Sequence, residues 1–237
     1  LGKEQLSTSF TQTDFMHKTI YMINELNILL LNTQYSSSSN INRFDKLNDE
    51  NMQGQKYDQW YYGPLKRFLQ IISWENKSPK KIYDTFKAIV SCQDVDESRH
   101  QKKKGELLLS NRYENVKIYD FMLDCNKKVL AAKIIYGLGY RWQKVGSTAN
   151  FSDNKTLYYN VSRYPDGGSN VIDYFAYSQV AYPLSKKIKI LFGGRVNHNS
   201  LRANFNNSTF SFKNVSNRNL SFIKSSLIAY KITKKST

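Results

Sequence analysis

Hydrophobic positions in the first half of the chain recur mostly at helical spacing. Apolar residues over 14–34 return every three or four positions, which predicts a helix, and the range 64–74 repeats this pattern. The pair Ser78-Pro79 is typical of a helix start and predicts a third helix. Residues 35–57 are polar and rich in Ser and Asn, which predicts a long loop. The first half is therefore expected to be mainly helical.

Alternation of apolar and polar residues is clearer in the second half. Residues 155–164 alternate as a half-buried strand does, and Pro165-Asp166-Gly167-Gly168 predicts a turn. A helix is expected to begin at Ser169 or Asn170 and to end before Pro183. Further elements expected are a helix over 116–133 and strands over 186–192, 207–213 and 220–233. The predicted fold class is α+β, with a strand–helix–strand unit in a mixed sheet of the second half.

Charge divides the chain into two unequal halves. The chain carries 35 Lys and Arg against 19 Asp and Glu, a net charge of +16. Residues 1–125 are nearly balanced, whereas residues 126–237 contain only three acids, Asp153, Asp166 and Asp173. A basic, aromatic-rich and almost acid-free block is typical of a polyanion binder. We therefore predict a charge-balanced helical module over 1–125 and a basic α+β RNA-binding domain over 126–237.

The sequence contains no motif specific enough to predict catalysis. The Gly-x-Ser-x-Gly, Gly-x-x-x-x-Gly-Lys, His-Glu-x-x-His and Gly-x-Gly-x-x-Gly patterns are all missing, and Gly137-Leu138-Gly139 predicts only a tight packing turn. The acids and His100 within 91–104 do not match a metal-ligand spacing, so a solvated loop is expected there. Cys92 and Cys125 are too far apart for a zinc pair and fit a reduced compartment. We expect no catalytic residue, no metal and no cofactor.

The apolar runs are also too short for a helical membrane span. A spanning helix needs roughly 20 consecutive apolar residues, and the best run, Ile28 to Leu31, is far shorter. The start of the chain carries no apolar signal-peptide region. No membrane span is therefore expected.

Candidate RNA contacts gather near the end of the chain. Lysines alternate with apolar residues over 186–190, and the segment 194–202 joins glycine, Asn and Ser to two arginines. Such donors suit contacts to phosphates and 2′-hydroxyls along an RNA backbone. The predicted RNA-binding residues are Lys186, Lys187, Lys189, Arg195, Asn197, Arg202, Lys213 and Arg218.

Two segments of the second half resemble a ribosomal family. Residues 155–165, followed by Ser169-Asn170-Val171-Ile172, are similar to a strand-then-helix segment of mitochondrially encoded forms of the third protein of the small ribosomal subunit. Residues 188–196 are similar to that family's Ile-Lys-Ile-x-x-x-Gly-Arg strand and turn, and the resemblance extends over about residues 155–233. It implies that Lys187, Lys189, Arg195 and Arg202 contact RNA.

These observations give one leading hypothesis and two rivals. The leading hypothesis is a non-enzymatic structural component of a mitochondrial small ribosomal subunit in the mitochondrial matrix. Its partners would be ribosomal RNA and neighbouring ribosomal proteins, with mRNA as a further candidate. The rivals are a metal-dependent nuclease of viral or low-GC bacterial origin and a basic, strand-rich virion or surface protein.

Overall fold

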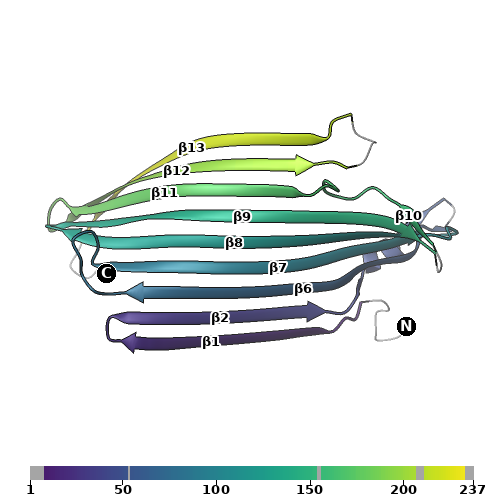
Figure 1. Cartoon of the computed structure of the whole chain (residues 1–237), viewed down its shortest axis with the longest axis horizontal. Helices are drawn as coiled ribbons and strands as arrows, with labels where there is room; N and C mark the ends of the chain where they lie inside the picture. The colour runs from purple at the N-terminus through teal and green to yellow at the C-terminus, as the bar shows by residue number, and fades with distance from the viewer. Residues whose placement is uncertain (1–7, 53, 154–155, 207–210, 233–237) are drawn as a thin grey trace.

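The computed structural model of the chain is almost entirely β-structure (Figure 1). It describes residues 8–52, 54–153, 156–206 and 211–232. The elements are β1 (Gln12–Asn24), β2 (Asn27–Ser38), β3 (Ile41–Asn42), α1 (Phe44–Leu47), β4 (Glu50–Asn51), β5 (Gly54–Gln55), β6 (Tyr57–Asn76), β7 (Thr85–Lys103), β8 (Leu109–Val129), β9 (Ala132–Ser152), β10 (Leu157–Tyr159), β11 (Ser169–Pro183), β12 (Ile188–Asn204) and β13 (Asn214–Tyr230).

The long strands form one antiparallel sheet in which each strand pairs with its neighbours along the chain. Their order is β1-β2-β6-β7-β8-β9-β11-β12-β13, and Figure 1 shows them side by side in a single layer. Among the described strands, β1 pairs only with β2 and β13 pairs only with β12, so the sheet has two open edges. One end of the sheet carries short connections, as between β8 and β9, whereas the other carries the longer segments 39–56 and 153–168.

The predicted α+β class is wrong, and the predicted helices are strands. Residues 14–34 form the β1–β2 hairpin, 64–74 lie in β6, and the segment after Ser78-Pro79 leads into β7. Residues 116–133 form the ends of β8 and β9, and 169–182 lie in β11. The pattern over 116–133 fits both periods because apolar residues occur on both faces of the strand, which makes the alternation hard to see.

Predictions in the second half had mixed outcomes. The turn at 165–168 is confirmed, since the Gly168 N–H donates to the Pro165 carbonyl at 2.9 Å and Gly168 has a φ of 84°. Within 155–164 only Leu157–Tyr159 is strand, and residues 154–155 lie outside the described residues. The strands expected over 186–192 and 220–233 fall largely within β12 and β13. Of the strand expected over 207–213, residues 207–210 lie outside the described residues and 211–213 are not strand. The expected division between residues 125 and 126 falls inside β8.

The sheet has almost no hydrophobic core. Among the described residues, the buried hydrophobic side chains are Trp60, Cys125 and Ala203. The accessible surface is 16812 Å², whereas a compact monomer of this mass exposes about 11,000 Å². Both faces of the sheet therefore lack the covering layer that a water-soluble domain builds.

Candidate functional site

The strand register sorts the side chains onto two faces of opposite character. Residues directly paired across antiparallel strands point to the same face, so the pairings define rows that run across the sheet. We call two neighbouring rows on one face the apolar belt. Its members are Thr19, Leu31, Ile72, Val90, Phe121, Tyr140, Tyr174, His198 and Leu220, and Tyr21, Leu29, Trp74, Ala88, Leu123, Leu138, Ala176, Val196 and Phe222. The belt contains no Asp, Glu, Lys or Arg.

The opposite face of the sheet carries charged residues at the positions along the strands that adjoin the belt. We call this face the polar wall. One of its rows is Lys18, Asn32, Ile71, Ser91, Asp120, Arg141, Asp173, Asn199 and Asn219, and another is Met22, Ile28, Glu75, Lys87, Asp124, Gly137, Tyr177, Arg195 and Ile223. The row between these two carries no charge. Charged residues therefore occupy one face of the sheet and avoid the other over the same stretch of strand.

The apolar face is also the more exposed face. Along β8, Phe121 is 38% exposed, whereas the flanking Asp120 and Met122 on the polar wall are both half-buried. Val90 is 53% exposed in the same row as Phe121. A protein that folds in water does the reverse, and a contiguous exposed apolar surface of this extent marks contact with another apolar phase or partner.

Charged side chains bound the apolar belt along the strand. On β8, the apolar-face residues from Tyr119 to Cys125 lie between Lys117 and Lys127. Lys117 pairs with Asp94 at 3.1 Å, and Lys127 pairs with Asp84 at 2.7 Å. Ten residue steps separate the two lysines, which is roughly 34 Å of extended strand.

Polar groups on the wall satisfy one another through cross-strand contacts. Arg141 Nε donates to Asp120 Oδ1 at 2.5 Å, and Asn199 Nδ2 donates to Asp173 Oδ1 at 2.6 Å. The Tyr177 hydroxyl donates to the Asp124 carboxylate. This wall is a hydrogen-bonded polar surface of both charge signs, suited to contact with water and polar solutes.

Arg195 differs from these residues because no carboxylate pairs with it among the described residues. Its guanidinium carbon lies 4.0 Å from the centroid of the Phe175 ring, and its Nε donates to Asn197 Oδ1 at 2.6 Å. The Phe175 ring in turn covers Gly139, where an added Cβ would lie 2.2 Å from a ring carbon. Gly137-Leu138-Gly139 is therefore not a turn. It lies within β9 and lets aromatic rings from β11 cross the strand closely.

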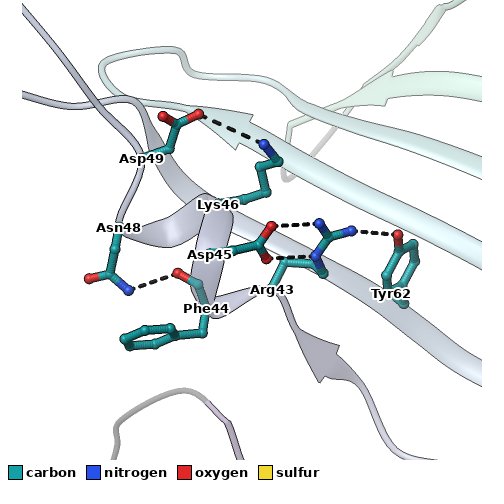
Figure 2. A network of polar contacts seen from close by, with 7 residues as sticks. All are labelled: Arg43, Phe44, Asp45, Lys46, Asn48, Asp49 and Tyr62. Carbon is teal, nitrogen blue, oxygen red and sulfur yellow. Dashed lines mark hydrogen bonds and ion pairs between the residues drawn. The ribbon is translucent and has the colours of Figure 1, made fainter.

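A salt-bridged loop is fastened to the polar face at the end of the sheet with the longer segments (Figure 2). Arg43 forms a two-pronged contact with Asp45 at 2.6–2.7 Å, and its Nη1 donates to the Tyr62 hydroxyl at 2.7 Å. The Arg43 hydrogen bonds lower the pKa of Asp45 to about 2. The same guanidinium lies 4.9 Å from the Trp60 ring centroid. Residues 43–48 are thus anchored to β6 by charge, hydrogen bond and ring contact together.

A second loop covers the same end through Glu114. This residue is 5% exposed, and burial raises the pKa of its carboxyl group. Arg163, from the segment between β10 and β11, lies 3.6 Å from Glu114 Oε2 and 3.3 Å from Glu97 Oε1. The ion pairs bring a distant loop onto β7 and β8.

The predicted RNA-binding residues are spread over both faces and both ends of the sheet. Lys186 and Lys187 lie in the short connection before β12, and Lys189 lies at its start. Arg195 and Asn197 lie on the polar wall, Lys213 precedes β13, and Arg202 and Arg218 lie on the apolar face beyond the belt. Lys186, Lys187 and Lys189 lie together at one end of β12, Arg195 and Asn197 lie together on the polar wall, and Arg202 and Arg218 are neighbours on the apolar face, so the eight residues do not form one site. Ile190 and Phe192, which follow the alternation of these lysines with apolar residues, lie on the apolar face.

Neither a metal centre nor a spanning helix is found in the described part of the chain. No group of three or more His, Cys, Asp and Glu side chains could hold a metal ion in these ranges. None of the helices there is long and apolar enough to cross a membrane.

Comparison with known proteins gives similarity of structure without similarity of sequence. No family model and no curated protein matches the sequence. The copper transporter OprC matches with a TM-score of 0.73 and 8% identity, over 95% of this chain and 35% of that one. The siderophore receptor PiuA from Acinetobacter baumannii matches with a TM-score of 0.63 and 13% identity, over 95% and 40%. The ferric yersiniabactin uptake receptor FyuA from Yersinia pestis matches with a TM-score of 0.60 and 12% identity, over 95% and 36%. The chain spans less than half the length of each, and the sheet resembles part of a β-barrel.

These findings overturn the ribosomal hypothesis. The range 155–233, whose resemblance to the third small-subunit ribosomal protein required a helix after a strand, forms β10 to β13 with no helix among its described residues. The similar structures are named as a transporter and receptors, and none of the three is named as a ribosomal protein. The predictions that depended on this hypothesis are wrong as well. They were the ribosomal RNA and protein partners, the location in the mitochondrial matrix and the absence of a membrane span. The excess of Lys and Arg over acids in residues 126–237 was misleading because the sequence does not show how these residues divide between the two faces of the sheet.

Proposed function

We propose that this chain forms part of the wall of a β-barrel in a bacterial outer membrane, where it takes part in solute uptake without enzymatic activity. The apolar belt faces lipid, and the polar wall faces the interior of the barrel. The observation that carries the proposal is the complete absence of charge from the exposed belt, opposite a charged and less exposed face. Alternation of apolar-out with polar-in residues is the pattern of membrane β-barrels.

The length of the uncharged stretch of the apolar face on β8 supports this assignment. The stretch of roughly 34 Å between Lys117 and Lys127 becomes about 24 Å when a strand tilts by about 45°, and barrels carry an apolar band about 25 Å tall. Strands such as β8 and β9, at 21 residues each, are about twice as long as the roughly 9–11 residues a membrane requires. The remainder extends beyond the bilayer at the end with the longer loops. Barrels of this kind have longer loops outside the cell, so that end is assigned to the exterior.

The solute class follows from the polar wall. Cross-strand ion pairs such as Arg141–Asp120 and exposed polar groups suit a hydrated, charged solute rather than an apolar one. The names of the similar structures mention copper, a siderophore and ferric yersiniabactin. A metal ion or a metal chelate is therefore the class of cargo that we propose.

A cysteine scan along β8 tests which face meets lipid. In the full-length protein with Cys92→Ser and Cys125→Ser, single substitutions Phe121→Cys, Met122→Cys and Leu123→Cys are labelled with a fluorophore in phospholipid vesicles. Lipids with a quencher in the acyl chain should quench the labels at 121 and 123 strongly and the label at 122 weakly. Equal quenching at all three positions, or failure of the protein to enter the vesicles, would contradict the proposal.

A further inference from the structure

We infer that the apolar face holds a binding site for an anionic phospholipid-like molecule, with Arg202 and Arg218 contacting its phosphate and its acyl chains lying along the belt. The inference rests on the proposed membrane location. It adds a specific lipid site that neither the fold nor the function of a barrel wall requires.

A groove on the apolar face has the shape and composition for such a ligand. Its volume is about 480 Å³, and it crosses β9, β11, β12 and β13. The lining residues are Trp142, Asn170, Ile172, Tyr174, His198, Ser200, Arg202 and Arg218. The register assigns all of them to the face that carries the belt. The groove is therefore open to the lipid phase rather than to the interior.

The two arginines carry the anion-binding part of the argument. Arg218 pairs with Ser200, and Arg202 pairs with Ser216, so the arginines are diagonal neighbours on adjacent strands. Neither guanidinium group has a hydrogen bond or an ion pair within the described residues, and both residues are exposed. Diagonal neighbours lie about 7–8 Å apart, and like charges in adjacent strands repel. A phosphate bound between them removes that repulsion and accepts hydrogen bonds from both guanidinium groups.

The rest of the groove suits the apolar part of a lipid. Tyr174 belongs to the belt, and its ring stacks on His198 with centroids 6.2 Å apart. Ile172 and Trp142 lie in the next row, which Arg218 shares, and Trp142 Nε1 donates to Asn170 Oδ1 at 3.3 Å. Trp side chains favour the boundary between hydrocarbon and headgroups. The groove thus runs from Arg202, through a row that holds both Arg218 and the Trp142 ring, to the apolar belt, so cations stand at one end and hydrocarbon at the other, as in a phospholipid.

The position of the arginines matches the headgroup level. Arg218 lies in the row next to the belt at the end with the longer loops, together with Trp142 and Ile172, and Arg202 lies one row further out, with Lys117 and Lys144. Lys117 is neutralised by Asp94, whereas Arg202 and Arg218 have no acidic partner among the described residues. Nucleic acid, the phosphate source first expected for these arginines, does not fit, because the groove continues into an uncharged apolar belt.

Quenching of Trp142 by brominated lipids tests the site. The full-length protein with Trp60→Phe and Trp74→Phe is reconstituted in phosphatidylcholine vesicles that contain a small, equal fraction of brominated phosphatidylglycerol or brominated phosphatidylcholine. We expect phosphatidylglycerol to quench Trp142 at least threefold more strongly. The double variant Arg202→Gln/Arg218→Gln should reduce that ratio to about one. Arg195→Gln, which removes an unpaired arginine from the opposite face of β12, should leave the ratio unchanged.

Each failure has a distinct meaning. Equal quenching by both lipids in the unmodified groove refutes the lipid site but leaves Trp142 in contact with lipid, so the membrane location stands. No quenching by either lipid refutes the membrane location and the site with it. A ratio that persists in the double variant, or falls equally in Arg195→Gln, overturns the role of the two arginines. Unchanged quenching by phosphatidylcholine in the double variant verifies that it is folded and inserted.

Discussion

An arginine placed in the apolar belt should destabilise the protein far more than one placed on the neighbouring position of the same strand. Val90 lies in the middle of the belt and is 53% exposed, whereas Ile89 faces the polar wall. In Val90→Arg, a guanidinium at the bilayer midplane costs about 2–4 kcal/mol. Loss of roughly half of a valine's transfer energy adds about 0.8 kcal/mol. The expected cost is about 3–5 kcal/mol.

The matched variant Ile89→Arg meets water and polar groups instead of lipid. It loses the partial burial of an isoleucine, about 1 kcal/mol, without a bilayer penalty. The two variants should therefore differ by at least about 2 kcal/mol, which is a factor of about 30 in the equilibrium constant.

Equilibrium unfolding of the vesicle-inserted, full-length protein in guanidinium chloride measures this difference. Trp74 and Trp142 both lie on the apolar face, so tryptophan fluorescence reports loss of lipid contact. The midpoint should fall strongly for Val90→Arg and slightly for Ile89→Arg at unchanged slope. Equal shifts, or a larger shift for Ile89→Arg, would refute the assignment of the two faces.

Two further predictions concern local packing and acid sensitivity. Gly139→Ala should destabilise the protein by about 1–3 kcal/mol in the same unfolding assay, because its Cβ would overlap the Phe175 ring. Gly146→Ala, with no atom within 4 Å of the added Cβ, should change stability little. The Asp45 pKa is lowered from 3.8 to about 2 by Arg43, so its stabilisation of the loop is present above pH 3.8 and lost as pH falls through about 2. Relative to Asp45→Asn, which lacks the carboxylate at every pH, pepsin cleavage of the unmodified protein within 39–56 should be slower at pH 3.8 and should approach the rate of the variant near pH 2; a constant ratio over that window would contradict this reasoning.

The sequence contained the strand signal, but interpretation required knowing what lies outside the protein. Phe121 and Leu123 alternate with Asp120 and Asp124, yet Met122 between them is apolar too, so the run also matched a helix. An apolar face that meets lipid needs no second layer, and the prediction assumed that apolar residues pack into a core. Local chemistry was more predictable, as the turn at 165–168 formed where Pro, Asp and Gly predicted it.

The candidate site was predictable in its chemistry and not in its location. Arg202 was predicted to contact RNA from the segment 194–202 and from the ribosomal resemblance, and Arg218 from the basic character of the second half; contact of both with phosphate remains a prediction with a different phosphate source. Arg195 and Arg202 are seven residues apart in β12. Because side chains alternate between the two faces of a strand, an odd separation places them on opposite faces. The two arginines cannot be assigned to faces until the segment is known to be a strand. The glycine pair in β9 likewise acquires its role only through Phe175 and Tyr177, which lie more than 35 residues away along the chain.

The strand order has a consequence for how such a sheet is assembled and altered. The described long strands pair in the order in which they follow one another along the chain, so each pair of neighbours comes from a continuous stretch of sequence and its contacts are local. Both outermost strands present unpaired backbone groups, which hydrocarbon does not tolerate, so a membrane-embedded state needs further strands against β1 and β13. A change in the number of strands is then simplest as the insertion or removal of a whole hairpin. Insertion or removal of one alters the circumference of the wall while every other pairing, and the alternation of its two faces, stays as it is.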